Sequence, residues 1–81
     1  MEARAQDEEL RIAIGARLRE WRLSQQRSQH ELASAVGIKQ ASLSNYELGR
    51  RDMTLLTAMR LAVALGTSLA ALVQGLENIS V

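Results

Sequence analysis

The sequence contains no cysteine and no proline. The lack of cysteine excludes a disulfide framework and cysteine-ligated zinc sites. Without proline, glycines and helix caps must mark where the elements end. No run approaches the roughly 20 consecutive apolar residues of a membrane-spanning helix. The first ten residues, MEARAQDEEL, are acidic and polar, unlike a secretory signal. These features favour a cytoplasmic protein that does not contact a membrane.

Aromatic residues are scarce as well, at 2% of the chain, namely Trp21 and Tyr46. Hydrophobic residues nevertheless make up 47% of the 81 residues, so the core must consist of aliphatic side chains. Aliphatic cores of this kind are typical of small helical bundles. The length allows one domain with a single core.

The net charge of +1 is low for a protein that binds nucleic acid. Residues 1–9 carry a net charge of −3, which leaves +4 on the rest of the chain. Acidic residues are favoured near a helix N-terminus, and a surface charge of +4 is ordinary for a soluble domain. Charge alone therefore does not assign a DNA-binding function.

The spacing of apolar residues predicts a first helix from about Asp7 to Gln25, after a frayed lead over residues 1–6. Its apolar stripe consists of Leu10, Ile14, Leu18 and Trp21. Ser28 and Glu31 have the spacing of a capping box, which predicts a second helix over 29–36.

Three further helices follow, and the chain shows no convincing strand. The third spans about Gln40 to Leu48, the fourth begins after the cap Thr54, and the fifth runs from about Leu69 to Gln74. The apolar residues of the fourth are Leu55, Met59, Ala62, Val63 and Leu65. The sequence therefore predicts an all-α domain over residues 7–75 with a C-terminal tail over 76–81.

The segment over about 28–48 combines two short helices with a tight turn at Val36-Gly37-Ile38. Gly37 suits the left-handed conformation that ends a helix. The small residue Ala33 lies where two helices must approach closely. This is the helix-turn-helix arrangement.

The third helix has two different faces at about 100° per residue. Leu43 and Tyr46 lie on one side and are predicted to face the core. The opposite side presents Gln40, Ala41, Ser44 and Asn45. Glutamine and asparagine amides pair with adenine, serine donates or accepts, and an alanine methyl packs on a thymine methyl. The alternative is a solvated face, but such faces are more commonly rich in glutamate and lysine.

Many residues of the chain match a known family pattern: Gln29, Glu31-Leu32-Ala33, Val36-Gly37-Ile38, Leu43-Ser44, Tyr46-Glu47, Gly49-Arg50, Leu61-Ala62, Ala64-Leu65-Gly66, Ser68-Leu69 and Leu72. With these residues the chain resembles the Cro/C1-type (XRE-like) helix-turn-helix family over about Ile14 to Gly75. The resemblance implies a five-helix lambda-repressor-like domain and a sequence-specific regulator of transcription, such as a repressor. It also implies a homodimer on a near-palindromic operator, with half-sites about 34 Å apart and the third helix in the major groove.

Phosphate contacts are expected on both sides of the third helix. By resemblance Gln29, at the start of the second helix, binds a backbone phosphate, and free amides there attract anions. The further phosphate candidates are Lys39, Ser42, Arg50, Arg51 and Arg27. Lys39 stands where the family usually has a serine or threonine cap, and Arg27 stands where it usually has a hydrophobic residue. The alternative for each basic residue is a solvated surface charge.

Two further expectations concern architecture. By resemblance, Arg22 and Glu47 form a partly buried ion pair that ties the first helix to the third. The dimer interface is expected at the C-terminal end, with Leu69, Leu72, Val73, Leu76 and Ile79. The alternative is that part of this set closes the core of the bundle.

An enzyme is not expected, because His30 is the only histidine and no phosphate-binding glycine loop or cluster of carboxylates is present. No metal, cofactor or small-molecule ligand is expected either. A second hypothesis is a protein-interaction module, such as the antitoxin of a toxin pair, which would need a toxin-binding extension. Controller proteins of restriction–modification systems and Cro-like repressors are similar in size. The sequence does not choose between them, nor between activation and repression.

Overall fold

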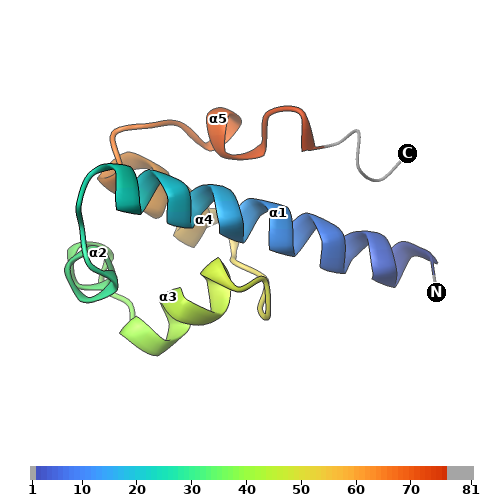
Figure 1. The fold of residues 1–81 in the computed structure, drawn as a ribbon, viewed down its shortest axis with the longest axis horizontal. Helices are drawn as coiled ribbons and strands as arrows, with labels where there is room; N and C mark the ends of the chain where they lie inside the picture. The colour runs from blue at the N-terminus through green and yellow to red at the C-terminus, as the bar shows by residue number, and fades with distance from the viewer. Residues whose placement is uncertain (1, 77–81) are drawn as a thin grey trace.

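The computed structural model describes the backbone of residues 2–76 and the side chains of residues 6–76. Over this range the chain is all-helical, which confirms the predicted fold class. Its five helices are α1 (Glu2–Ser24), α2 (Gln29–Val36), α3 (Gln40–Glu47), α4 (Leu55–Ala64) and α5 (Leu69–Val73). In Figure 1 the long α1 crosses the whole molecule, with α5 above it, α3 below it and α2 at one end. None of the helices within residues 2–76 is both long enough and apolar enough to cross a membrane.

The observed helix bounds differ from the predicted ones mainly at the start of α1. This helix begins at Glu2 rather than near Asp7, so residues 2–6, which were predicted as a frayed lead, are part of α1. Residues 2–6 include two alanines, the strongest helix formers, and neither glycine nor proline interrupts this segment. Figure 1 shows the N-terminal turns of α1 extending beyond the other helices. Of the tail predicted over 76–81, all but Leu76 lies outside the described residues.

The capping box at the start of α2 is present as predicted. The amide of Glu31 donates to the Ser28 hydroxyl at 3.0 Å, and the amide of Ser28 donates to the Glu31 carboxylate at 2.9 Å. At the other end, Gly37 adopts φ 75° and donates its amide to the α2 carbonyls. Both ends of α2 are thus fixed by residues within one turn of it.

The capping box makes the stability of the protein sensitive to acid. The hydrogen bonds from Ser28 hold the pKa of Glu31 below its ordinary value. The stabilisation is therefore present above the unfolded pKa of about 4.3 and is lost as the pH falls through the folded pKa. We expect Glu31→Gln to be less stable than the wild type at pH 7 and to differ less from it at pH 3. Urea unfolding at the two pH values measures this. Glu20→Gln, at an exposed position on α1, is the control, and an equal pH response of both variants would contradict the prediction.

One leucine from each helix forms the centre of the core. These five side chains, which are almost completely buried, are Leu18, Leu32, Leu43, Leu61 and Leu72. The two aromatic residues, Trp21 and Tyr46, are partly buried and pack against this cluster. The aliphatic core predicted from composition is therefore present.

The core includes some of the C-terminal residues that were predicted to form either the dimer interface or part of the bundle core. Leu72 and Leu76 are buried within the chain itself, so they help to close the bundle. Leu69 is half-buried, Val73 is exposed, and Ile79 lies outside the described residues. The periodicity of a five-residue helix could not separate these positions in advance, because it contains little more than one turn.

A side chain in the C-terminal half of α1 and another just after this helix hold the C-termini of α5 and α4. The Arg17 guanidinium donates to the carbonyls of Ala71, Leu72 and Gln74, at 3.2, 3.3 and 2.8 Å. The Gln25 amide donates to the Leu65 carbonyl at 2.6 Å. The last carbonyls of a helix have no partner within it, and they attract donors and positive charge. These bonds fix α4 and α5 against α1.

Candidate nucleic-acid interface

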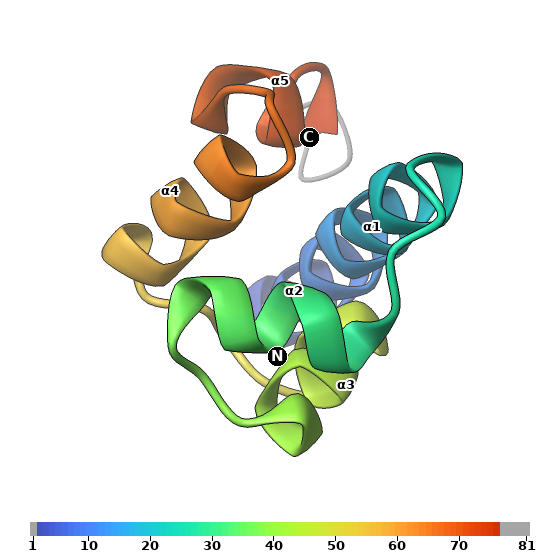
Figure 2. The ribbon, with the colours of Figure 1, turned by 90° about the vertical axis from the view of Figure 1, so that its left-hand side faces the viewer.

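Helices α2 and α3 form the predicted helix-turn-helix. The turn is closed by the amide of Ile38, which donates to the Ala33 carbonyl at 3.0 Å. Ala33 itself is buried, as expected for a small residue at a close approach of two helices. Figure 2 shows α2 crossing above α3, with the N-terminus of α3 reached directly from the turn. The short turn between the two helices therefore fixes the position of α3 relative to α2.

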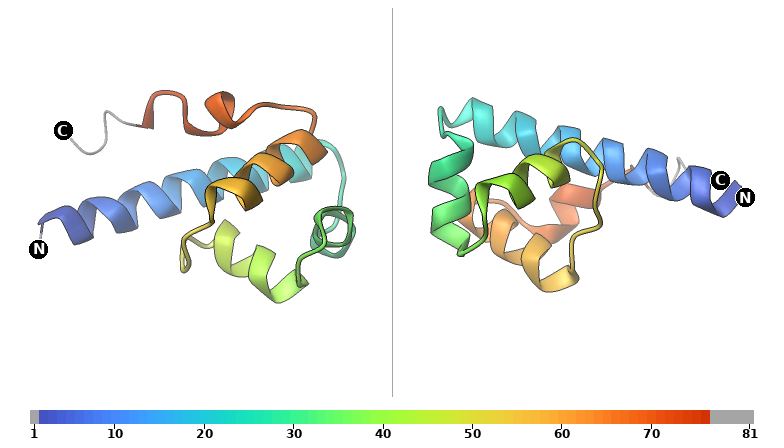
Figure 3. Two further views of the ribbon diagram at one scale, coloured as in Figure 1. Left: turned by 180° about the vertical axis from the view of Figure 1, so that it is seen from behind. Right: turned by 90° about the horizontal axis from the view of Figure 1, so that it is seen from below.

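The two faces of α3 lie as its periodicity predicts. Leu43 is completely buried and Tyr46 is half-buried against the core. On the other side, Gln40 and Ala41 are exposed, while Ser44 and Asn45 are half-exposed. The right panel of Figure 3 shows α3 lying across the lower surface of the molecule in front of α1. The four polar or small residues of α3 thus belong to one accessible surface.

The start of α3 carries a positive charge. Lys39 is the N-cap residue, its backbone is extended, and its side chain makes no capping hydrogen bond. The ammonium group is exposed beside the positive end of the helix dipole. An anion is therefore favoured at this end of α3, where the family usually has a neutral cap.

Leu48 is a residue of this surface that the sequence reasoning missed. It is the C-cap of α3, and its side chain is 53% exposed. Its position could have been found from the periodicity, because it falls between Ser44 and Ala41 on a helical wheel and out of phase with Leu43. An exposed apolar side chain here has the right chemistry to contact a thymine methyl group.

The segment after α3 supplies exposed positive charge. Arg50 and Arg51 are exposed, and neither forms an ion pair within the described part of the chain. The nearby carboxylate of Asp52 lies 3.6 Å from Arg11 instead. The amide of Arg50 donates to the Asn45 carbonyl at 2.9 Å, which holds this segment against the end of α3. Ser42 lies half-buried at the edge of α3.

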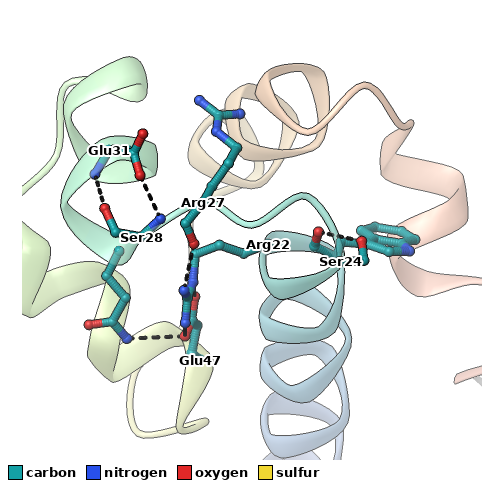
Figure 4. A network of polar contacts seen from close by, with 8 residues as sticks. Arg22, Ser24, Arg27, Ser28, Glu31 and Glu47 are labelled. Carbon is teal, nitrogen blue, oxygen red and sulfur yellow. Dashed lines mark hydrogen bonds and ion pairs between the residues drawn. The ribbon is translucent and has the colours of Figure 1, made fainter.

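Arg22 and Glu47 form a bidentate ion pair beneath this surface (Figure 4). Arg22 Nε lies 2.6 Å from Glu47 Oε2, and Nη2 lies 2.9 Å from Oε1. The two residues are only 7% and 5% exposed. The hydrogen bond to Glu47 raises the pKa of Arg22, and burial opposes this to a smaller extent. The pair joins α1 to the last turn of α3.

Two residues that were predicted to contact phosphate, Gln29 and Arg27, bond to this network. The Gln29 amide donates to Glu47 Oε1 at 3.1 Å, so its side chain is oriented between α2 and the end of α3. The Arg27 side chain lies elsewhere, because its guanidinium donates to the Ala64 carbonyl at 2.7 Å. Figure 4 shows the Arg27 guanidinium pointing away from the ion pair. The unpaired carbonyls at the end of α4 attract it, so the guanidinium of Arg27 lies beside α4 in this structure.

The described residues contain no group of three or more histidine and carboxylate side chains placed to hold a metal ion. His30 is exposed on α2. The accessible polar surface of α3 therefore remains the candidate functional site.

The helix-turn-helix family model HTH_3 matches residues 18–72, which is most of the chain. Among solved structures, the restriction-modification controller protein C.AhdI from Aeromonas hydrophila is 33% identical, with a TM-score of 0.73 over 75% of this chain and 92% of that one. The clp gene regulator ClgR from Corynebacterium glutamicum is 31% identical, with a TM-score of 0.80 over 88% and 76%. The hypothetical transcription factor NHTF from Neisseria is 29% identical, with a TM-score of 0.75 over 82% and 76%. A comparison with curated protein sequences finds no significant match. The chain therefore belongs to the Cro/C1-type (XRE-like) helix-turn-helix family and is a DNA-binding transcriptional regulator, not an enzyme.

Proposed function

We propose that the protein binds a near-palindromic operator as a homodimer, with α3 of each copy in the major groove. The observation that carries this proposal is the accessible face of α3, formed by Gln40, Ala41, Ser44 and Asn45. This face has no carboxylate to repel DNA, and its side chains have the hydrogen-bonding groups that read base edges. The buried Leu43 on the opposite side holds the helix rigidly.

The phosphate contacts in this proposal come from residues around α3. They are Gln29, Lys39, Ser42, Arg50 and Arg51. Phosphate contacts of this kind fix the register of the protein on the duplex without reading its sequence. A protein bound across a promoter excludes other proteins from it, so we propose a cytoplasmic repressor as the simplest outcome.

The homodimer in this proposal uses the side of the molecule next to the segment after α3. Leu69 and Val73, from the expected interface, line a largely apolar hollow there together with Met53 and Leu55. Its polar lining includes Arg51, which is also a proposed phosphate contact. Leu55 is among the most exposed large apolar residues of the chain. A second copy placed on this hollow would cover apolar surface and leave the accessible face of α3 free.

Selection of bound sequences from random duplex DNA tests the proposal. We expect an enriched palindrome whose affinity falls as salt concentration rises, because phosphate contacts release counterions. Sedimentation of the complex with the selected duplex gives the number of chains bound, and two are expected. The proposal fails if no sequence is enriched or if binding does not respond to salt.

Gln40→Ala should weaken binding to the selected operator by about 1–3 kcal/mol, because one bidentate base contact is lost. The same change should relax the base preference at one position of each half-site. Quantitative gel-shift titration on the operator and on its single-base variants measures both effects. Equal weakening on operator and random DNA would mean that Gln40 does not read a base.

Arg50→Ala should weaken binding to operator and random DNA by similar factors, because a phosphate contact carries no sequence information. The slope of log affinity against log salt should fall by about one unit. Salt titrations of the two duplexes measure this. The control is Arg19→Ala, an exposed arginine on α1, which should leave the slope unchanged. A base-specific loss for Arg50→Ala would contradict its assignment to phosphate.

A further inference from the structure

Helix α4 has more apolar surface than it buries in the core. Its only charged residue is Arg60. Ala58, Leu61 and Ala62 face the core and are buried. On a different side, Leu56, Met59 and Val63 are 57%, 45% and 73% exposed. A helix that is apolar nearly all round is normally covered on all of its apolar sides, so this exposed side of α4 indicates a contact surface.

The exposed side of α4 forms one wall of a groove, and the C-terminal part of α2 forms the other. The groove is lined by Arg27, Ala35, Val36, Leu56, Met59, Arg60, Val63 and Ala64. Figure 2 shows α4 between α2 and α5, with α2 as its neighbour on the side opposite α5. The lining is apolar except for two arginines and contains no carboxylate. We call it the α2–α4 groove.

The two arginines give this groove positive charge, which the exposed carboxylate of Glu31, acting on Arg27, offsets only in part. Arg60 is exposed and has no ion-pair partner within the described part of the chain. Arg27 donates one N–H to the Ala64 carbonyl, which is neutral, and its charge is likewise unpaired among the described residues. A partner that covers the apolar wall must therefore also meet two guanidinium groups. Carboxylates beside apolar side chains satisfy both requirements.

We propose that the α2–α4 groove binds an amphipathic helix of another protein, with carboxylates that pair with Arg60 and Arg27. Its apolar stripe contacts Leu56, Met59 and Val63. The ten residues of α4 span about 15 Å, which matches two to three turns of a bound helix. Two packed helices present ridges and grooves that accept a third helix, and this is a common mode of peptide recognition.

A second copy of this chain fits the groove less well. In a two-fold symmetric contact the groove would meet itself, which would bring the Arg27 and Arg60 side chains of both copies together. Like charges brought together in this way are costly. DNA also fits poorly, because its phosphates would have to lie against an apolar wall. The groove shares no residue with the DNA surface of α3 or with the hollow proposed for the homodimer, so this proposal does not rest on either.

Selection of helical peptides displayed on phage against the full chain tests the proposal. Peptides that also bind a Val63→Asp variant are removed first, which leaves those that need the groove. Val63 is so exposed that this change leaves the core intact. We expect the selected peptides to share apolar residues at helical spacing with aspartate or glutamate beside them.

Arg60→Glu should weaken the binding of the selected peptides by about tenfold, which corresponds to about 1.4 kcal/mol. The control Arg19→Glu, at an exposed site on α1, should change it by less than about twofold.

Several results would overturn the proposal. They are a selection without enrichment, selected peptides without acidic residues, and equal affinity for the wild type and Arg60→Glu. Dissociation of the homodimer by Val63→Asp in sedimentation would mean that the groove is the self-association surface instead. Displacement of the peptide by random duplex DNA would assign the groove to nucleic acid. Operator binding by Arg60→Glu, measured in parallel, should be unchanged and reports separately on the proposed function.

Discussion

Replacing Glu47 with alanine should lower the free energy of unfolding by about 3–5 kcal/mol, because it leaves Arg22 buried without a partner. Arg22 is 7% exposed, and its guanidinium has only the Arg27 carbonyl, at 2.9 Å, as a remaining acceptor. A domain of this size is stable by only about 4–12 kcal/mol. The variant should therefore be partly unfolded well below the temperature at which the wild type unfolds.

Urea unfolding followed by circular dichroism measures the effect of Glu47→Ala. The double variant Arg22→Met/Glu47→Met is the informative control. Removing both charges also removes the desolvation cost, so the double variant should recover much of the lost stability. Glu20→Ala, at an exposed position, should cost less than about 0.5 kcal/mol. A loss below about 1 kcal/mol for Glu47→Ala would show that the ion pair does not hold α3 to α1.

Gly15→Ala should destabilise the protein by about 3 kcal/mol, at the upper end of the range for overpacking. A Cβ at Gly15 would lie 2.6 Å from the Glu47 carbonyl oxygen and would also clash with the Tyr46 carbonyl oxygen. These are backbone atoms, so they cannot rotate away as a side chain can. Intrinsic helix propensity acts in the opposite direction, because alanine is favoured over glycine in a helix by about 1 kcal/mol. Whether Gly15→Ala lowers or raises the free energy of unfolding therefore shows whether the clash outweighs the helix propensity.

Thermal and urea unfolding of Gly15→Ala measure this change. The matched control is Gly66→Ala, where a Cβ would meet nothing within 4 Å but φ is 72°. It should cost only about 1–2 kcal/mol, through backbone strain. Folded Gly15→Ala protein should also bind the selected operator more weakly, because the methyl group pushes α3 away from α1. Stabilisation by Gly15→Ala would contradict the close approach of these helices.

The local features of the fold could be predicted because their causes lie within a few residues. Ser28, Glu31 and Gly37 define both ends of α2 through hydrogen bonds that span one turn. The core side of α3 follows from the periodicity of Leu43 and Tyr46 for the same reason. The start of α1 was predicted too late, because no apolar residue in a core stripe marks its first turns.

Residues whose partners are distant in sequence required the tertiary structure. Arg27 was predicted to contact phosphate, and its hydrogen bond to the Ala64 carbonyl beside α4 could not be foreseen from the sequence. The apolar residues of α4 gave no sign that Ala62 and Leu65 enter the core while Met59 and Val63 remain outside.

The sequence by itself determined the all-α class, the helix-turn-helix and the polar face of α3, since caps and periodicity act over one or two turns. Only the tertiary structure decided which apolar surfaces remain free, where each unpaired arginine lies, and how α1 meets α3 at Gly15. An apolar side chain is attracted equally by any apolar surface, because the hydrophobic effect has no direction. Its place is therefore set by the packing of the whole chain, and not by its neighbours in sequence.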